Sequence, residues 1–340
     1  MAIRRMLYRR GMLASFRADV PVISVGNLSV GGTGKSPTVI KLVRFLIERV
    51  GLRVAIVSRG YGRSSVGMRV VSDGTAIRCG VEEAGDEPVM LAEALPSAIV
   101  IVSEDRALGA REAVLRGADV IVLDDGYQHL KLKRDLNILL LDASIALGSV
   151  LPFGRARERL SAARDADIVI FTNAEYAERG EKLAKKMFPF VSEYALVATM
   201  VAAPIGFEQI AGPGVETATM EDHTLVDGKS VVAVSSIARP ERFHRMLAEL
   251  GSRVMQHTLR DHADYTDATV ERAIDQAKRA RAGMIITTTK DAVKSREFFR
   301  KAAPPMPVYV LHYELEFISG ETEFFERLTA ASTHKISVNE

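Results

Sequence analysis

The stretch GNLSVGGTGKS, residues 26–36, limits what this 340-residue chain can fold into more than any other part of it. It follows the apolar run VPVISV and precedes SPTVIKLVRFLIERVG, in which apolar residues recur at helical spacing up to Gly51. Glycines let backbone N–H groups turn inward around an anion, and the N-terminus of a following helix favours negative charge. The sequence therefore predicts a strand, a phosphate-binding loop and a helix in succession.

Residues 31–36, GGTGKS, supply the groups that a nucleotide needs from such a loop. Lys35 would reach the outer phosphates, and the Ser36 hydroxyl would bind Mg²⁺. The first position of the general G-x-x-x-x-G-K-[ST] pattern is Ser29 instead of glycine, and a glycine-rich turn without a ligand is the alternative interpretation. We expect the nucleotide to be bound by Ser29, Val30, Gly31, Gly32, Thr33, Gly34, Lys35 and Ser36.

Two acids follow another apolar run, in DVIVLDDG, and suit a metal site beside such a loop. A phosphate-binding loop works with an acid on a neighbouring strand, and ligands of open α/β sheets bind at the carboxyl ends of strands. We therefore expect Asp124 and Asp125 to hold Mg²⁺; a polar strand end with a capping acid is the alternative. A guanine-specific protein would carry Asn/Thr-Lys-x-Asp, but in TTTKDAVKS Lys290 is followed at once by Asp291, so ATP is the expected nucleotide.

The arrangement of the apolar runs predicts an α/β fold. VPVISV, RVAIVS, AIVIVS, DVIVLD, LNILLLD and DIVIFT are continuously apolar, as strands buried on both faces of a parallel sheet are, and helical stretches separate them. We expect a P-loop NTPase-type domain with a doubly wound, mostly parallel sheet over residues 1–190, an extended connector over 191–228, and a second, smaller α/β domain over 229–330. Residues 331–340 are expected to form a loose tail.

Composition excludes several classes of protein. The chain has one cysteine, Cys79, which excludes an internal disulfide framework and a cysteine-rich metal site. A net charge of +2 does not indicate binding to nucleic acid, and no run of 18 apolar residues predicts a membrane span. No obligate protein partner is inferred.

The first 17 residues are basic, with five arginines and no acid. In a helix their apolar and basic side chains would lie on opposite faces: Ile3, Met6, Leu7 and Tyr8 on one, and Arg4, Arg5, Arg9 and Arg10 on the other. Such a segment could lie on an anionic membrane surface. A solvated basic segment that packs lightly on the domain is an equal alternative.

Several further segments are dense in charged or polar residues at predicted strand ends: SRGYGR (58–63), AGDEP (84–88), EDR (104–106), DDGYQH (124–129), LPFGRARE (151–158) and DHADYTD (261–267). With GNLSVGGTGKS, and in this order, they resemble the tetraacyldisaccharide 4′-kinase family of lipid A synthesis over about residues 20–320. The resemblance implies transfer of the γ-phosphate of ATP, with Mg²⁺, to the 4′-hydroxyl of a tetraacyl glucosamine disaccharide 1-phosphate. It also implies a peripheral location at the cytoplasmic face of the bacterial inner membrane, with a cytoplasmic location as the alternative.

The resemblance assigns roles to two residues that are far apart in the sequence. Asp86 matches the general base of the family, and His262 matches the histidine that partners it. A carboxylate tuned by an imidazole is a suitable base for a sugar hydroxyl. Because the two residues belong to different predicted domains, we expect the domains to close over the substrates. From the residues alone, a helix-capping acid at Asp86 and a surface histidine at His262 are the favoured interpretations.

Other residues near strand ends complete the expected site. Arg106 and Arg157 would clamp phosphate oxygens and stabilise the transition state, with surface ion pairs as the alternative. Glu87, beside the expected base, would touch Mg²⁺ or be a surface acid. The acceptor is expected to contact Asn27, Arg59, His129 and Glu158, although a core histidine is a rival interpretation of His129.

Two other functions stay open. A P-loop ATPase that drives assembly of another protein would fit the loop, but residues 26–30 contain no second lysine and Cys79 is the one cysteine. A kinase with a soluble acceptor would use the same chemistry. Family members commonly begin with a longer hydrophobic helix, so the short basic N-terminus favours this third function mildly and indicates membrane association less strongly than catalysis.

Overall fold

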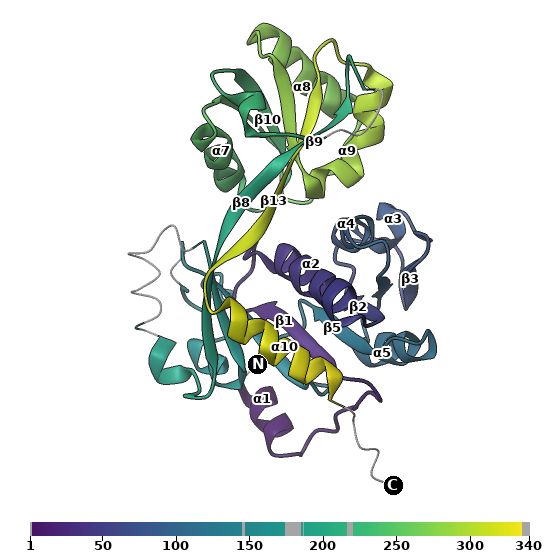
Figure 1. Ribbon diagram of the computed structural model, residues 1–340, viewed down its shortest axis with the longest axis vertical. Helices are drawn as coiled ribbons and strands as arrows, with labels where there is room; N and C mark the ends of the chain where they lie inside the picture. Colours follow the sequence, from purple (N-terminus) through teal and green to yellow (C-terminus); the bar gives the residue numbers. More distant parts are fainter. Residues whose placement is uncertain (1, 145–146, 174–184, 186, 216–219, 335–340) are drawn as a thin grey trace. The chain divides into compact units, whose positions relative to one another are not determined.

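The computed structural model describes residues 2–144, 147–173, 185, 187–215 and 220–334, and the chain forms two compact units. The first unit comprises residues 1–202 and 315–340, and the second comprises residues 203–314. The chain passes from the first unit to the second within strand β8 (Leu196–Ala211) and returns within strand β13 (Val308–Ser319) (Figure 1).

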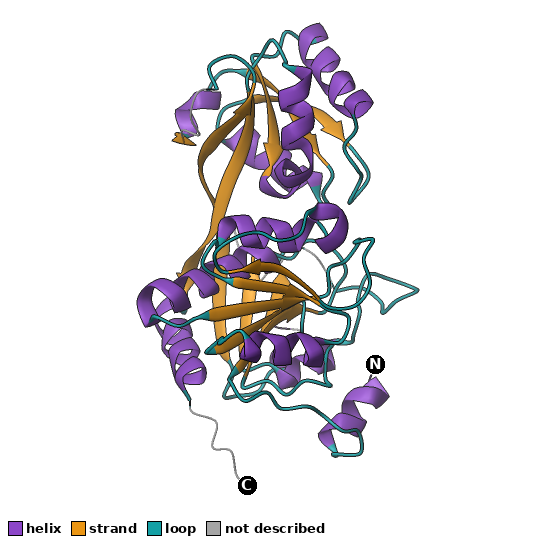
Figure 2. Ribbon diagram, turned by 90° about the vertical axis from the view of Figure 1, so that its right-hand side faces the viewer, coloured by secondary structure: helices purple, strands orange, loops and turns teal. Residues whose placement is uncertain are grey.

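The first unit is built on a mostly parallel sheet. Its strand order is β8–β7–β6–β1–β5–β2–β4–β3; β3 is antiparallel to β4, and the other pairs are parallel. The strands are β1 (Val22–Asn27), β2 (Val54–Ser58), β3 (Arg69–Asp73), β4 (Ile99–Val102), β5 (Val120–Asp124), β6 (Leu136–Asp142) and β7 (Ile168–Thr172). Every residue of β1, β2 and β4–β7 is buried, because helices cover both faces of the sheet (Figure 2).

The first unit also contains helices, most of which lie between these strands in the sequence. They are α1 (Ala2–Arg9), α2 (Lys35–Phe45), α3 (Val81–Ala84), α4 (Asp86–Ala94), α5 (Arg106–Leu115) and α10 (Glu321–Thr333), with 3₁₀ turns at Leu160–Asp165 and Phe188–Phe190. The helix expected after the phosphate-binding loop is present: α2 continues as a π-helical turn, Leu46–Val50, and ends at Gly51 in the left-handed conformation. Within the part of the chain that is described, no helix is long and apolar enough to cross a membrane.

Helix α1 buries a charged side chain instead of presenting all its arginines to solvent. Arg5 is only 5% exposed and forms ion pairs with Glu158 and Asp165, and Arg9 also contacts Asp165. The expectation of a basic face available to a membrane is therefore wrong for Arg5, whereas Arg9 stays exposed. The sequence pattern placed them correctly on one helical face but could not show that acids more than 150 residues away would pair with them.

The second unit has a smaller parallel sheet in the order β11–β10–β12–β13. Its remaining elements are β9 (Met220–Glu221), β10 (Ser230–Ser235), β11 (Arg253–Thr258), β12 (Met284–Thr288), α7 (Pro240–Glu249), α8 (Asp267–Arg279), α9 (Thr289–Ala302) and a 3₁₀ turn at His223–Val226. Alternate residues of β10 enter two apolar clusters. Val232 and Val234 pack with α8 and α9, whereas Val231 and Ala233 pack with α7.

The expected fold class is confirmed, but the boundaries of the two compact units differ from the expected domain boundaries. Residues 191–202 and 315–330, which we assigned to the connector and the smaller domain, lie in the first unit. The connector expected over 191–228 contains the 16-residue strand β8, whose first half alternates between buried and less buried residues. Residues 335–340 of the expected tail lie outside the described residues, and 331–333 complete α10.

Candidate active site

The phosphate-binding loop joins β1 to α2 and is held in shape by side chains of the first unit. Asn27 donates from Nδ2 to the Thr33 hydroxyl over 2.7 Å, and the Thr172 hydroxyl donates to the Thr33 carbonyl over 2.9 Å. Gly34 precedes α2 with φ +84°, and a Cβ there would lie 3.3 Å from Leu315, so glycine fits this position best. The loop therefore leads into α2 with its backbone already shaped, and the helix N-terminus favours an anion.

Lys35 and Ser36 open α2, and Lys35 faces the end of β5. The Lys35 ammonium lies 3.6 Å from a carboxylate oxygen of Asp125, and both residues of α2 are partly exposed. A lysine at this place supplies positive charge for phosphate oxygens, and a serine hydroxyl supplies a hard oxygen ligand for a divalent cation.

Asp124, the last residue of β5, is a buried acid with spare binding capacity. It is 1% exposed, and Oδ2 accepts a hydrogen bond of 3.1 Å from the Ser58 hydroxyl. Its other oxygen, Oδ1, has no hydrogen-bond partner among the described residues. Burial, followed by the negative charges of Glu87 and Asp125, raises the pKa of Asp124 to about 7, although the Lys35 charge opposes this. A carboxylate in this position would gain much from a bound cation.

Asp125 is held differently, although it is the next residue. Its φ of +51° turns the chain out of β5, and Arg157 donates to both its carboxylate oxygens over 2.8 and 2.7 Å. Burial alone would raise the pKa of Asp125, but the charges of Lys35 and Arg157 outweigh burial and lower it. Asp125 is therefore an ionised partner of two cations, whereas Asp124 keeps an oxygen unused.

Arg106 begins α5 and lies in the field of the same two acids. It is 5% exposed, and its Nη1 atom donates to the Ser103 carbonyl over 3.3 Å. Burial lowers the pKa of Arg106, and the charges of Asp124 and Asp125 counteract this. The alternative of a surface pair with Asp105 is wrong, because Asp105 caps α5 and binds Lys131.

Glu87 and His129 lie at the edge of this group of charges. Glu87, in the first turn of α4, is close enough to contribute to the raised pKa of Asp124. Burial and the neighbouring charge of Arg106 lower the pKa of His129 to about 4, so its imidazole is neutral near pH 7. Its Nε2 atom is buried without a hydrogen-bond partner in the described part of the protein.

Asp86 stands at the start of α4 and is 5% exposed. Its Oδ1 atom accepts a hydrogen bond of 2.9 Å from the backbone N–H of Glu87. The residue before it, Gly85, has φ +91°, and a Cβ there would lie 2.9 Å from the Tyr61 carbonyl. The turn that presents Asp86 therefore depends on glycine, and the N-terminus of α4 favours its negative charge.

Three residues expected to contact the acceptor have other surroundings in the structure. Both carboxylate oxygens of Glu158, which is 5% exposed, bind Arg5. Asn27 is fully buried and shapes the phosphate-binding loop through Thr33. Arg59 follows β2 and is exposed, within the electrostatic range of Arg106. These surroundings favour structural roles for Glu158 and Asn27.

His262 belongs to the second unit. It adopts φ +58°, and its backbone N–H donates to the Ser236 carbonyl over 3.0 Å. Its ring nitrogen Nε2 lies 3.2 Å from the Lys290 ammonium, and because an ammonium can only donate, this contact requires an unprotonated Nε2. The side chain is 26% exposed, so it is anchored by its backbone and open to solvent at its ring.

The first unit thus gathers six of the predicted residues at the carboxyl ends of its central strands: Lys35, Glu87, Arg106, Asp124, Asp125 and Arg157. Sequence reasoning did not assign Ser58, which bonds to Asp124, although it opens the quoted segment SRGYGR at the end of β2. No group of three or more His, Cys, Asp or Glu side chains arranged for a metal occurs among the described residues. The site suits a cation that takes part of its coordination from a phosphate.

A parallel α/β sheet with a glycine-rich loop after its first strand, a lysine and serine at the next helix, and a buried acid on the neighbouring strand defines a P-loop nucleotide-binding protein. Residues 1–333 match the model of the family described as tetraacyldisaccharide-1-P 4′-kinase. The chain belongs to this family.

Individual relatives agree with this assignment. A tetraacyldisaccharide 4′-kinase of Anaeromyxobacter sp. (strain Fw109-5) is 38% identical over 97% of this chain and 87% of its own length. That of Desulfotalea psychrophila is 40% identical over 91% of this chain and 87% of its own. The crystal structure of LpxK from Aquifex aeolicus in complex with ATP covers 97% of this chain and 94% of its own, with a TM-score of 0.76 and 32% identity.

The family, the kinase class and the P-loop α/β fold predicted from the sequence are therefore confirmed. The roles of individual site residues and the pairing of Asp86 with His262 stay predictions, as do the connector and domain closure.

Proposed function

We propose that this protein transfers the γ-phosphate of ATP to the 4′-hydroxyl of a tetraacyl glucosamine disaccharide 1-phosphate, in the synthesis of lipid A. The observation that carries the proposal is Asp124, a buried acid with an unpartnered oxygen that lies in the fields of Lys35, Arg106 and Asp125. The relatives named tetraacyldisaccharide 4′-kinase support the acceptor.

The donor set fits Mg²⁺, and we assign its protein ligands to Asp124 and Ser36. Carboxylate and hydroxyl oxygens are the ligands that Mg²⁺ prefers, and bound Mg²⁺ supplies charge neutralisation at the β- and γ-phosphates. Asp125 is less suited to be a ligand, because Arg157 already occupies both its oxygens. The neighbouring charge of Glu87 strengthens the preference of Asp124 for a cation.

The loop and three arginines would position ATP. Backbone N–H groups of residues 31–34 and the Lys35 ammonium would bind its phosphates, whereas the Val30 N–H already donates to the Arg155 carbonyl. Arg106 would stabilise charge that spreads over the transferred group, with Arg157 and Arg59 beside it. Because phosphoryl transfer needs mainly positioning and charge neutralisation, these cations account for most of the chemistry required from the protein.

We assign the general base to Asp86, with His262 as the residue that partners it. A buried carboxylate at a helix N-terminus can accept the proton of a sugar hydroxyl, and the glycine-dependent turn before it limits its movement. His262 belongs to the other unit, and its role is proposed from the family resemblance.

The test follows γ-labelled ATP into lipid and into free phosphate, with Mg²⁺ and the tetraacyl acceptor in detergent micelles. Label in the lipid, lost in Asp86→Asn but retained in the exposed control Asp19→Asn, is the expected result. Free phosphate alone, unaffected by Asp86→Asn, would identify a P-loop ATPase instead. Equal transfer to a deacylated disaccharide would identify a kinase with a soluble acceptor.

We also propose peripheral contact of α1 with an anionic membrane, at the cytoplasmic face of the bacterial inner membrane. Arg4 and Arg10 are exposed, and so are Ile3 and Met6, at 72% and 42%. Exposed apolar and basic side chains on a short helix suit the interface of an anionic bilayer, where the acyl chains of the acceptor lie.

Replacing Arg4 and Arg10 with glutamate should reduce sedimentation with vesicles that contain an anionic lipid. Arg5 and Arg9 are left unchanged, because their substitution would break ion pairs inside the protein. A control carrying Arg272→Glu and Arg279→Glu, two exposed positions on α8, should sediment as the wild type does. Equal sedimentation of both variants would contradict the membrane role of α1.

A further inference from the structure

We infer that Arg5 of α1 is a positioning residue for the nucleotide phosphates, acting through Glu158 on the segment that carries Arg157. The inference rests on the ATP site proposed above. It assigns a role in that site to a side chain of the N-terminal helix.

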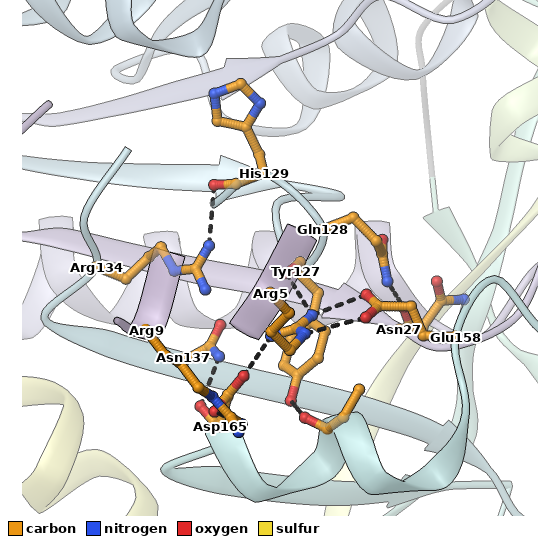
Figure 3. A network of polar contacts seen from close by, with 11 residues as sticks. Arg5, Arg9, Asn27, Tyr127, Gln128, His129, Arg134, Asn137, Glu158 and Asp165 are labelled. Carbon is orange, nitrogen blue, oxygen red and sulfur yellow. Dashed lines mark hydrogen bonds and ion pairs between the residues drawn. The ribbon is translucent and has the colours of Figure 1, made fainter. Parts of the chain in front are cut away.

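Arg5 is buried, and two acids bind its guanidinium. Its Nε and Nη2 atoms donate to the two carboxylate oxygens of Glu158 over 3.0 and 2.8 Å, and Nη1 donates to Asp165 over 2.6 Å (Figure 3). Burial by itself would lower the pKa of Arg5, but the hydrogen bonds and charges of Glu158 and Asp165 raise it above the usual value. This bidentate contact fixes both the orientation of the Glu158 carboxylate and its distance from the Arg5 guanidinium.

The segment that Arg5 holds runs along the beginning of the phosphate-binding loop. The backbone N–H of Val30 donates to the Arg155 carbonyl over 2.9 Å, and that of Arg157 donates to the Leu28 carbonyl over 2.7 Å. Ser29 and Ala156 form an antiparallel bridge between these two bonds. Residues 155–157 therefore support residues 28–30 directly, and Glu158 is the next residue along the chain.

The same segment controls the acid beside Lys35. Arg157 binds both oxygens of Asp125, and Lys35 lies 3.6 Å from one of them. A displacement of the backbone at 157–158 would move the Arg157 guanidinium, change the charge balance at Asp125, and disturb the start of the loop. Small errors in the position of a catalytic constellation are expensive, on the order of 100-fold for about 1 Å.

Arg5 also contacts the turn that follows Asp125. Its Nη2 atom lies 3.4 Å from the Tyr127 carbonyl, and its guanidinium is 5.1 Å from the centre of the Tyr127 ring. The Tyr127 hydroxyl in turn donates to the Ala162 carbonyl over 2.7 Å. One side chain of α1 thus contacts both Tyr127 and Glu158 (Figure 3). These two residues belong to the chain segments, 125–127 and 155–158, that bring Asp125 and Arg157 together.

The decisive experiment compares Arg5→Met with Arg9→Met in the full-length protein. Both substitutions remove an arginine of α1 that contacts Asp165. In the described structure Arg9 makes no hydrogen bond or ion pair with Glu158, so it serves as the matched control. MgATP and MgADP binding is measured by calorimetry without acceptor, well below the unfolding temperature of each variant. We expect the Kd of MgATP to rise about 10-fold or more in Arg5→Met, by analogy with residues that orient the ligands of a metal site without binding the metal. In Arg9→Met the Kd should stay within about twofold of the wild-type value.

Two further variants separate positioning from simple stabilisation. In Arg5→Met/Glu158→Gln the loss of MgATP affinity should be no larger than in the more affected single variant, since both act through one contact. Arg5→Lys, which keeps the charge but not the bidentate contact, should be intermediate, and it also provides the comparison if Arg5→Met does not fold. The same order should appear in kcat/KM for ATP.

Equal nucleotide affinity in Arg5→Met and Arg9→Met would overturn the inference, as would additive losses in the double variant. Because nucleotide binding is measured without the lipid, the outcome does not depend on the acceptor. A wild-type protein that binds MgATP but does not phosphorylate the lipid would refute the proposed acceptor and leave the role of Arg5 to be judged on binding alone.

Discussion

Each unit of this protein buries an aspartate near the carboxyl end of a central strand, and the two aspartates have opposite surroundings. In the second unit Asp291, fully buried in the first turn of α9, accepts hydrogen bonds from the backbone N–H and hydroxyl of Ser236 and from the Thr288 hydroxyl. In the first unit Asp124 accepts one hydrogen bond, from Ser58, and its Oδ1 atom has no partner in the described residues.

The comparison shows how hydrogen bonding distinguishes a buried acid that stabilises the fold from a buried acid that is available to bind a cation. A buried carboxylate with all its oxygens hydrogen-bonded is stabilised in its charged form, whereas one with an unpartnered oxygen is destabilised until a cation arrives. The Thr288 hydroxyl also accepts from the backbone N–H of Asp291, so TTTKD acts as a helix-capping motif. The same residue type therefore serves architecture in one unit and the proposed catalysis in the other.

The strongest test of this contrast is Asp124→Asn. We expect phosphoryl transfer to fall by about 10²–10³-fold, because the carboxylate charge that would bind Mg²⁺ is lost. Thermal stability without Mg²⁺ should stay equal or increase, since the substitution removes an unpaired buried charge. Steady-state kinetics and thermal unfolding in EDTA measure the two effects, and a large loss of stability with near-normal activity would reverse the interpretation.

The matching substitution in the second unit, Asp291→Asn, should act mainly on stability. An amide cannot accept from Ser236 and Thr288 as the carboxylate does, and its NH₂ group would face donors, which should lower the free energy of unfolding by about 2–3 kcal/mol. MgATP binding should be unchanged, because Asp291 contacts only the second unit in the described structure. Denaturant unfolding gives the first quantity and calorimetry the second. Unchanged stability would contradict an architectural role.

The pKa of Asp124 sharpens the comparison further. Its value of about 7 in the folded protein lies above the usual 3.8, so the folded state binds this proton more tightly than the unfolded state does. The resulting stability is fully present below about pH 4 and is lost as pH rises through 7. Without Mg²⁺, the unfolding temperature of the wild type relative to Asp124→Asn should therefore fall between pH 5 and pH 8. Added Mg²⁺ with ATP should restore it, and a flat difference would refute the raised pKa.

The smallest expected effect concerns His129, which lies near the positive charge of Arg106. Its pKa of about 4 predicts a neutral ring throughout the physiological range. In ¹H–¹⁵N spectra its ring signals should not titrate between pH 5.5 and pH 8. A midpoint near 6.5 would show that burial and the charge of Arg106 have less influence on this edge of the site than on Asp124.

Much of this arrangement could be predicted because it is local in the sequence. The loop after β1, the acids after β5 and the strands buried on both faces each follow from residue type and spacing within about ten positions. The roles of Asn27 and Glu158 were less accessible. Asn27 bonds to a residue six positions away across a turn, and Glu158 bonds to one 153 positions away, so no local pattern distinguishes their buried contacts from contacts to a substrate.

The sequence by itself determined the α/β class, the nucleotide loop and the likeness to a kinase family, because glycine conformation, helix periodicity and apolar strands act over short distances. Only the tertiary structure decided which charged side chains pair with each other and which acid keeps an unpaired oxygen. Asp124 and Asp125 are adjacent and chemically identical, yet Arg157 binds one while burial beside Ser58 isolates the other. Likewise, Arg5 and Arg4 look equivalent in a basic helix, and the difference arises because folding brings Glu158 and Asp165 to one of them. Electrostatic roles depend on burial and on distant partners, and both exist only once the chain has folded.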